Sequence, residues 1–159
     1  MKLSTRIPPP VVLLIALTLM YALARLIDFD FLNFSPALRA LSISYFISGL
    51  LAATGFMLMI SGVLAFKKAK TTVNPLKPEQ ASQLVVNGVY RFTRNPMYLG
   101  MVFLLVAWGF ILLSLPALIM LPAFMLYIYF FQIKAEEAAM EKLFGNDFVV
   151  YKKRVRCWL

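Results

Sequence analysis

Long apolar segments divide the chain into four candidate membrane helices. They run from about Val11 to Ile27, Leu38 to Phe66, Met97 to Leu113 and Pro116 to Ile133. A helix needs roughly 20 residues to cross a bilayer core, and fewer when flanking residues reach the interface. Only a few residues around Ser114 separate the last two segments. The pattern therefore predicts an all-α integral membrane fold of about four transmembrane helices, the last two forming a tight hairpin.

Polar residues gather in two segments, about 67–96 and 134–159, on either side of the predicted hairpin. Both segments are basic, and Lys2 and Arg6 precede the first helix, whereas the hairpin tip carries no charge. Cytoplasmic loops of membrane proteins carry an excess of Lys and Arg. We therefore predict that both termini are cytoplasmic and that the C-terminal tail forms an amphipathic helix. Residues 1–159 are expected to form a single membrane domain, with two N-terminal transmembrane helices in 1–66.

Composition excludes several classes of chemistry. The chain is 62% apolar and 14% charged, and its 16 Lys and Arg exceed its 7 Asp and Glu by nine. With no His there is no imidazole base and no His-dependent triad. Cys157 is the single cysteine, which excludes an intrachain disulfide and a Cys-rich metal site. No metal signature and no nucleic-acid motif is present.

The first apolar segment has a second interpretation as a secretory signal peptide. Its C-terminal end, around Tyr21 and Arg25, lacks the small residues of a cleavage site, which favours a membrane helix. The small size of the chain, 159 residues, favours a location in a prokaryotic inner membrane.

A basic, turn-forming stretch precedes the third helix. Residues 87–100 read N-G-V-Y-R-F-T-R-N-P-M-Y-L-G. Pro96 suits the first turn of a helix, and the free N–H groups of such a turn favour a carboxylate or phosphate. A simple membrane anchor is the alternative, with Arg91 and Arg94 at lipid head groups and tyrosines at the interface.

Acidic residues follow the fourth helix, where topology favours basic ones. Gln132 and Glu136 are four apart and share a helical face, and Glu137 comes next. Lys or Arg would suit both a cytoplasmic boundary and a helix C-terminus. Either a functional carboxylate lies here or the helix simply continues into water. The basic tail, residues 144–156, is typical of an interfacial helix attracted to anionic lipid.

Taken in order, these segments resemble the isoprenylcysteine carboxyl methyltransferases and the wider group of membrane methyltransferases that includes the phospholipid N-methyltransferases. The resemblance covers roughly residues 67–159 and implies a methyltransferase-like core there. It rests on five motifs in family-like order: Q-L-V at 83–85, G-V-Y at 88–90, R-N-P-M-Y-L-G at 94–100, Glu136-Glu137, and F-G-N-D-F-V-V-Y-K-K-R-V at 144–155. Each motif is weak alone, but the five together are specific.

The resemblance implies that S-adenosylmethionine binds on the cytoplasmic side. Glu136 suits its amine, and Arg94 or the helix start at Pro96 suits its carboxylate. Leu84, Val85 and Tyr90 suit its adenine. The residues that match the family's cofactor motifs are Ser82, Gln83, Leu84, Val85, Tyr90, Arg94, Asn95, Pro96, Met97, Tyr98, Glu136 and Glu137.

Two positions depart from the family pattern. Asn95 stands where eukaryotic members commonly have His, and it keeps the hydrogen-bonding capacity without the charge. Gln132 stands where prenyl-substrate enzymes carry an Arg for the substrate carboxylate. Gln binds a carboxylate less strongly than a guanidinium does, although Gln132 is still expected to contact the substrate.

The resemblance therefore implies an integral-membrane methyltransferase that uses S-adenosylmethionine and acts on a lipophilic small molecule or lipid. The carboxylate of a prenylcysteine-like compound is one candidate acceptor. Methyl transfer needs alignment and a dry path more than an acid or base, so no catalytic residue is assigned. The alternative is a non-catalytic scaffold or a transporter. Arg25 and Arg39 are the only charges within the predicted helices, both near ends, which opposes a proton-coupled carrier.

Overall fold

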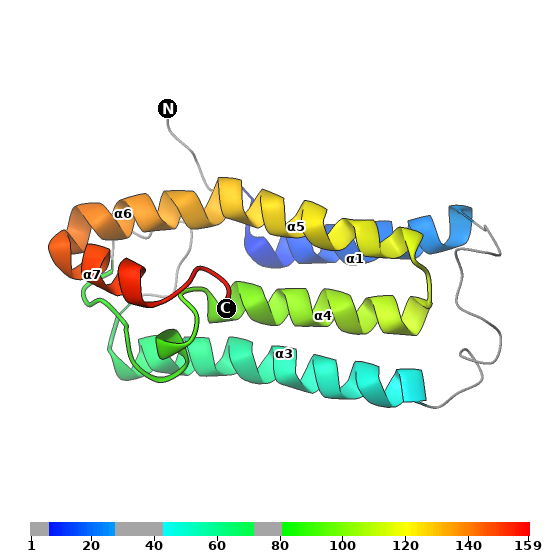
Figure 1. Cartoon of the computed structure of the whole chain (residues 1–159), viewed down its shortest axis with the longest axis horizontal. Coiled ribbons are helices and arrows are strands. Elements are labelled where there is room, and N and C mark those ends of the chain that lie inside the picture. The colour runs from blue at the N-terminus through cyan, green and yellow to red at the C-terminus, as the bar shows by residue number, and fades with distance from the viewer. Residues whose placement is uncertain (1–6, 28–42, 72–80) are drawn as a thin grey trace.

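The computed structural model describes residues 7–27, 43–71 and 81–159, and these residues form helices joined by short connections, without strands (Figure 1). The predicted loop after the first helix, the predicted helical residues 38–42 and the basic residues Lys2, Arg6 and Lys77 lie outside these ranges. The elements are α1 (Pro9–Leu26), α3 (Ile43–Lys68), the short 3-10 helix η3 (Gly88–Arg91), α4 (Pro96–Leu112), η4 (Pro116–Ile119), α5 (Met120–Ile128), a π-helical turn (Tyr129–Ile133), α6 (Lys134–Phe144) and α7 (Asn146–Arg154).

Three of the described helices are long and apolar enough to cross a membrane. These are Pro9–Leu26, Ile43–Lys68 and the continuous helix Pro116–Phe144, which joins η4, α5, the π-helical turn and α6. The all-helical membrane fold is thus as predicted. The apolar helix α4 has 17 residues and is shorter than these three. A fourth crossing by α4 stays a prediction.

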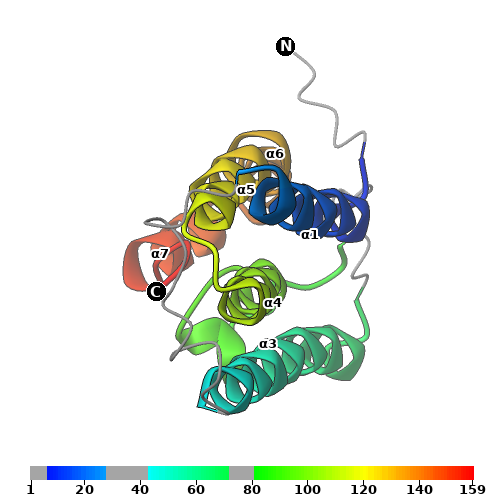
Figure 2. The same cartoon turned by 90° about the vertical axis from the view of Figure 1, so that its right-hand side faces the viewer.

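The helices lie side by side, with α4 between α3 and the pair formed by α1 and α5 (Figure 2). Pro8, in extended conformation, precedes α1, and Pro9 lies in its first turn, where the missing N–H costs nothing. The indole Nε1 of Trp108 on α4 donates to the carbonyl of Leu17 on α1 at 3.1 Å. The connection between α4 and η4 is short, and Leu113 turns the chain with a positive φ of 50°.

Close contact between α3 and α4 depends on a pair of glycines. A Cβ atom on Gly55 would lie 2.7 Å from the carbonyl oxygen of Gly100, far inside van der Waals distance. Small residues allow such close helix approach in membranes, where packing rather than the hydrophobic effect drives association.

We expect Gly55→Ala to separate α3 from α4 and to destabilise the protein by about 2 kcal/mol, because overpacking a tight contact typically costs 1–3 kcal/mol. Thermal unfolding in detergent measures the effect. Gly49→Ala on the same helix is the control, since nothing lies within 4 Å of a Cβ there. Equal unfolding temperatures for the two variants would contradict the prediction.

The C-terminal tail folds back onto the polar end of the bundle. Gly145, with a φ of 52°, ends α6 and begins α7. Phe148 and Tyr151 on α7 are buried against residues that include Leu84 and Met140, while the basic residues 152–154 are exposed. The apolar face of α7 therefore packs against protein.

Candidate functional site

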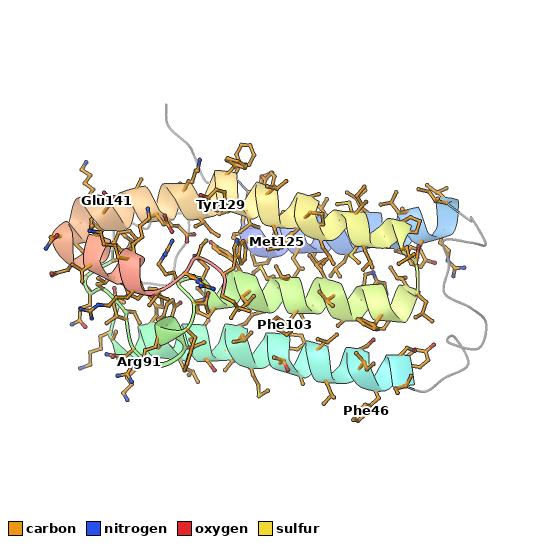
Figure 3. All side chains as sticks on the ribbon, in the orientation of Figure 1. Phe46, Arg91, Phe103, Met125, Tyr129 and Glu141 are labelled. Carbon is orange, nitrogen blue, oxygen red and sulfur yellow. The ribbon has the colours of Figure 1, made fainter. Side chains whose placement is uncertain are left out.

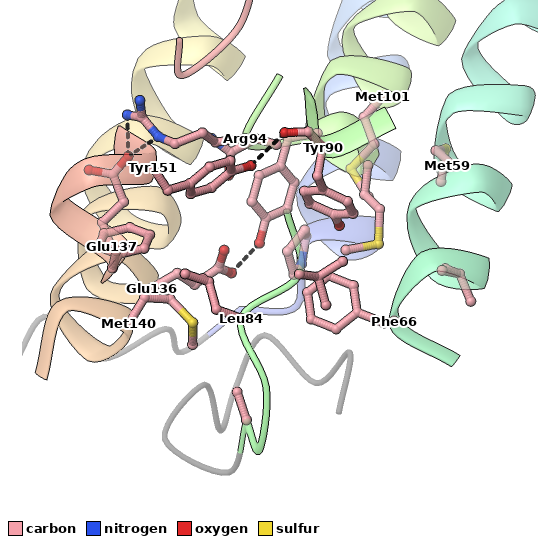
Figure 4. A pocket seen from close by; sticks show the side chains of 18 of the residues that line it. Met59, Phe66, Leu84, Tyr90, Arg94, Met101, Glu136, Glu137, Met140 and Tyr151 are labelled. Atoms are coloured by element: carbon pink, nitrogen blue, oxygen red, sulfur yellow. Dashed lines mark hydrogen bonds and ion pairs between the residues drawn. The ribbon is translucent and has the colours of Figure 1, made fainter. Parts of the chain in front are cut away.

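A cavity of about 510 Å³ opens at the polar end of the bundle. The charged labelled side chains, Arg91 and Glu141, lie at this end, whereas Phe46 and Phe103 lie along the apolar part of the bundle (Figure 3). The cavity walls come from α3, the segment 81–98, α4, α6, α7 and the residues Pro8–Pro10 (Figure 4). Ten of the twelve predicted cofactor residues line it: Gln83, Leu84, Val85, Tyr90, Arg94, Asn95, Met97, Tyr98, Glu136 and Glu137.

Glu136 places a carboxyl group in the wall of the cavity. The hydroxyl of Tyr98, in the first turn of α4, donates a hydrogen bond to Glu136 Oε1 (Figure 4). No ion pair to Glu136 occurs among the residues that the structure describes. The bond holds the carboxylate beside the N-terminus of α4.

Glu137 has a different environment because two basic side chains already neutralise it. Its Oε1 accepts hydrogen bonds from Arg94 Nη2 at 2.6 Å and from Arg94 Nε at 3.2 Å, and its Oε2 lies 2.7 Å from Lys152 Nζ. Arg94 Nη1 also donates to the carbonyls of Lys152, at 3.1 Å, and Val155. In the described contacts, four of the five guanidinium N–H groups are therefore used, two on Glu137 of α6 and two on carbonyls of the tail.

Further hydrogen bonds fix the tail to the segment before α4. The Arg94 N–H donates to the Arg156 carbonyl at 3.0 Å, and the hydroxyl of Thr93 and Nδ2 of Asn95 donate to the Cys157 carbonyl at 3.2 and 3.0 Å. The Tyr151 hydroxyl donates to the carbonyl of Tyr90 at 2.8 Å. Burial raises the pKa of Tyr151, so its phenol stays protonated as this bond requires.

Cys157 lies where the tail meets the segment before α4, in contact with Thr93 and Asn95. Burial raises the pKa of its thiol, and Asn95 Nδ2 lies 3.4 Å from its Sγ. Only a thiolate is an effective nucleophile, so this cysteine is protonated and unreactive near neutral pH.

The remaining walls of the cavity are apolar and aromatic. Tyr90 is 4% exposed, and its ring meets that of Phe66 edge to face with centroids 5.4 Å apart. The other apolar lining residues include Met59, Val63, Leu84, Val85, Met101, Met140 and Phe148. A flat hydrophobic group with one or two polar ends suits such a surface.

Three predicted residues do not line the cavity. Ser82 is exposed, and its N–H donates to Thr71 Oγ1 at 2.9 Å. Pro96 is buried as the first residue of α4. Gln132 is completely buried in the π-helical turn, and its Nε2 donates to the Ile7 carbonyl at 2.7 Å. Whether any of the predicted residues binds cofactor or substrate stays a prediction.

Several lining residues were not predicted. Met140 lies four residues after Glu136, so helical periodicity places both on one face. Phe148 and Tyr151 follow the same rule on α7. Pro8–Pro10 and the α3 residues come from parts of the chain that lie far from the motifs in sequence, and no local pattern marks them.

Comparison with known proteins assigns the family. The family model described as phospholipid methyltransferase matches residues 43–147, about two thirds of the chain. A protein from Haemophilus influenzae, described only as uncharacterized, is 40% identical over 63 residues, which make up 40% of this chain and all of that protein. No solved structure matches the chain. The chain belongs to the phospholipid methyltransferase family, a group of integral-membrane methyltransferases, in agreement with the resemblance seen in its motifs.

Proposed function

We propose that the protein is an S-adenosylmethionine-dependent methyltransferase that methylates a lipophilic acceptor at the membrane surface. The observation that carries the proposal is the cavity in which Glu136 meets the first turn of α4 between apolar walls. Its volume of about 510 Å³ lies within the usual range for small-molecule sites.

The donor groups of the cavity fit the chemistry of this cofactor. Glu136 offers an acceptor for the ammonium group. The N–H groups of Met97 and Tyr98 belong to a first helical turn, which leaves such groups without intrahelical partners and favours a carboxylate. Leu84, Val85 and the tyrosine ring of residue 90 offer walls for the adenine.

The protein itself binds the cofactor, aligns it with the acceptor and excludes water from the site. When bound, the cofactor supplies an electrophilic methyl group on its sulfonium. The tail supplies Phe148 and Tyr151 to one wall. Arg94 and Glu137 hold it there through the carbonyl and the ammonium group of Lys152. The buried rings of Tyr90 and Tyr98 reduce the polarity of the cavity. Such a site accelerates a displacement chiefly by orientation, and it needs no histidine.

The contacts of the basic side chains favour an acceptor whose reacting group carries no negative charge. Arg94 is the only Lys or Arg lining the cavity in the described part of the chain, and it is bound to Glu137. Gln132, which stands where the similar prenyl-substrate enzymes carry a carboxylate-binding Arg, is bound to the Ile7 carbonyl. A prenylcysteine-like carboxylate therefore has weaker support than a lipophilic acceptor without a negative charge.

The charge pattern supports a topology with both termini and the cavity on the cytoplasmic side. Lys67 and Lys68 end α3 at the cavity end, and the basic residues of α7 lie at the same end.

Calorimetric titration with S-adenosylhomocysteine in detergent and in lipid tests the cofactor, and transfer of labelled methyl from S-adenosylmethionine to a total lipid extract tests the reaction. We expect micromolar binding and labelled lipid. A folded protein that binds no S-adenosylhomocysteine in either medium would overturn the proposal and leave a membrane scaffold as the better interpretation.

A further inference from the structure

The last residues of the chain lie on one flank of the bundle, where its polar end meets its apolar part. Figure 1 shows the C-terminus at the start of α4, and Figure 2 shows α7 and the C-terminus on the same flank. The carbonyl of Arg156 accepts a hydrogen bond from the Arg94 N–H at 3.0 Å. The next residues, Cys157 and Trp158, pack against the buried apolar core. Arg156 therefore lies at the boundary between the polar and apolar parts of the protein.

Three basic side chains of this segment, Lys153, Arg154 and Arg156, are exposed. We call them the tail patch. None of them forms an ion pair with another residue that the structure describes. Glu137 is already neutralised by two other basic side chains, and Asp147 lies in the first turn of α7, at the opposite end of that helix. The tail patch therefore has no acidic partner within the described structure, and an anion from outside the protein suits it.

Helix electrostatics explains only part of this charge. Basic side chains in the last turn of a helix interact favourably with its dipole, which suits Lys153 and Arg154 at the end of α7. Arg156 lies beyond the helix and gains little from that dipole. The apolar face of α7, with Phe148 and Tyr151, is buried against protein and is not free to enter a membrane. Contact between α7 and a membrane therefore depends on its exposed basic residues.

Apolar residues follow the tail patch directly. Trp158 packs against the core of the bundle, and the side chain of Leu159 is 67% exposed. At a membrane interface, basic side chains meet the phosphate groups, while Trp and aliphatic side chains meet the adjoining acyl chains. The order of residues 153–159, basic and then apolar, matches this layering. A free anion in water or an acidic protein offers no apolar layer for Leu159.

We propose that the tail patch binds the phosphate groups of anionic phospholipids in the surrounding bilayer, with Trp158 and Leu159 at the level of the upper acyl chains. Lys and Arg close to an anionic membrane surface are attracted to it, and salt screens the attraction. A zwitterionic head group carries a cation of its own and binds the patch less tightly. The site does not depend on the proposed function, because none of the three basic residues lines the cavity.

Quenching of Trp158 fluorescence by phospholipids with brominated acyl chains measures lipid at the patch. The chain has two tryptophans, and Trp108→Phe removes the signal of the other one. In mixed micelles with unlabelled phosphatidylcholine, brominated phosphatidylglycerol should bind about tenfold more tightly than brominated phosphatidylcholine, equivalent to roughly 1.4 kcal/mol. Native mass spectrometry, which counts bound lipids, gives the same comparison for protein that keeps Trp108. Equal binding of the two lipids would overturn the proposal.

The double variant Arg154→Gln/Arg156→Gln should remove most of the preference for phosphatidylglycerol. Both side chains are exposed, and the main-chain bond of Arg156 is kept, so folding should tolerate the change. Lys68→Gln/Arg91→Gln is the matched control. It removes the same charge from exposed residues at the same end, where Lys68 ends α3 and Arg91 lies on the α3 side (Figure 3). An equal loss in both variants would mean that overall charge, and not the tail patch, selects the lipid.

Inorganic phosphate distinguishes a lipid site from a site for a free anion. Sodium phosphate and sodium chloride at equal ionic strength should weaken the binding of phosphatidylglycerol equally, because both act by screening. Displacement by phosphate at a much lower ionic strength than by chloride would mean that the patch binds the free anion, and the lipid assignment would be wrong. A preference for phosphatidylglycerol that is unchanged at high salt would contradict an electrostatic site.

Discussion

Glu136→Gln is expected to weaken the binding of S-adenosylhomocysteine about a hundredfold while the fold is retained. The change keeps the size of the side chain and its bond with Tyr98, since an amide oxygen also accepts a hydrogen bond. It removes the one carboxylate in the cavity that no basic side chain neutralises in the described structure. Loss of one partner of a largely desolvated ion pair costs about 3 kcal/mol or more, which corresponds to a factor of about a hundred in affinity.

Calorimetry of the purified variant beside Glu141→Gln measures this effect. Glu141 is an exposed residue on the same helix and lies outside the cavity, so its substitution makes the same change in charge without touching the site. Both variants should unfold within a few degrees of the wild type. An affinity that falls equally in both, or in neither, would mean that Glu136 does not bind the ammonium group.

Local sequence features were sufficient to predict the helices. Four apolar runs gave α1, α3, α4 and the long final helix to within a few residues at their described ends, and Pro96 marked the start of α4 as expected. The final apolar run ends near Ile133, and the helix continues to Phe144, which is one of the two interpretations that the sequence left open for the acidic residues after it. The residues from Lys134 onward are good helix formers, and nothing between them and Ile133 breaks the helix.

The sequence also indicated which residues meet at the cavity, because the family motifs surround one site. It did not indicate what each charged group does. Arg94 was expected to suit a ligand carboxylate, yet its donors are bound to Glu137 and to main-chain carbonyls of the tail. Every residue has a carbonyl, so a main-chain partner leaves no signal in the sequence. Gln132 likewise donates to a main-chain carbonyl, that of Ile7, which lies 125 positions away. Nothing in the sequence marks that contact either.

The position of Arg94 leads to the second large effect. Arg94→Met is expected to release the tail, residues 146–157, from the segment before α4 and to destabilise the fold by about 3 kcal/mol. Methionine keeps an apolar stem but removes both bonds to Glu137 and those to the Lys152 and Val155 carbonyls. The side chains of Arg94 and Glu137 are only 11% and 15% exposed, so breaking their ion pair carries the cost typical of a buried pair.

Hydrogen exchange of the tail and its cleavage by trypsin after Lys152 and Lys153 measure the release of the tail, with Arg91→Met as the control at an exposed arginine. Combining Arg94→Met with Glu137→Gln should cost less than the sum of the single changes, because both remove the same contact. The outcome separates two roles for Arg94. If it positions the tail, protection and cofactor affinity fall together, because α7 supplies Phe148 and Tyr151 to the cavity wall. If Arg94 instead binds the ligand carboxylate directly, affinity falls while the tail stays protected, and the positioning role is wrong.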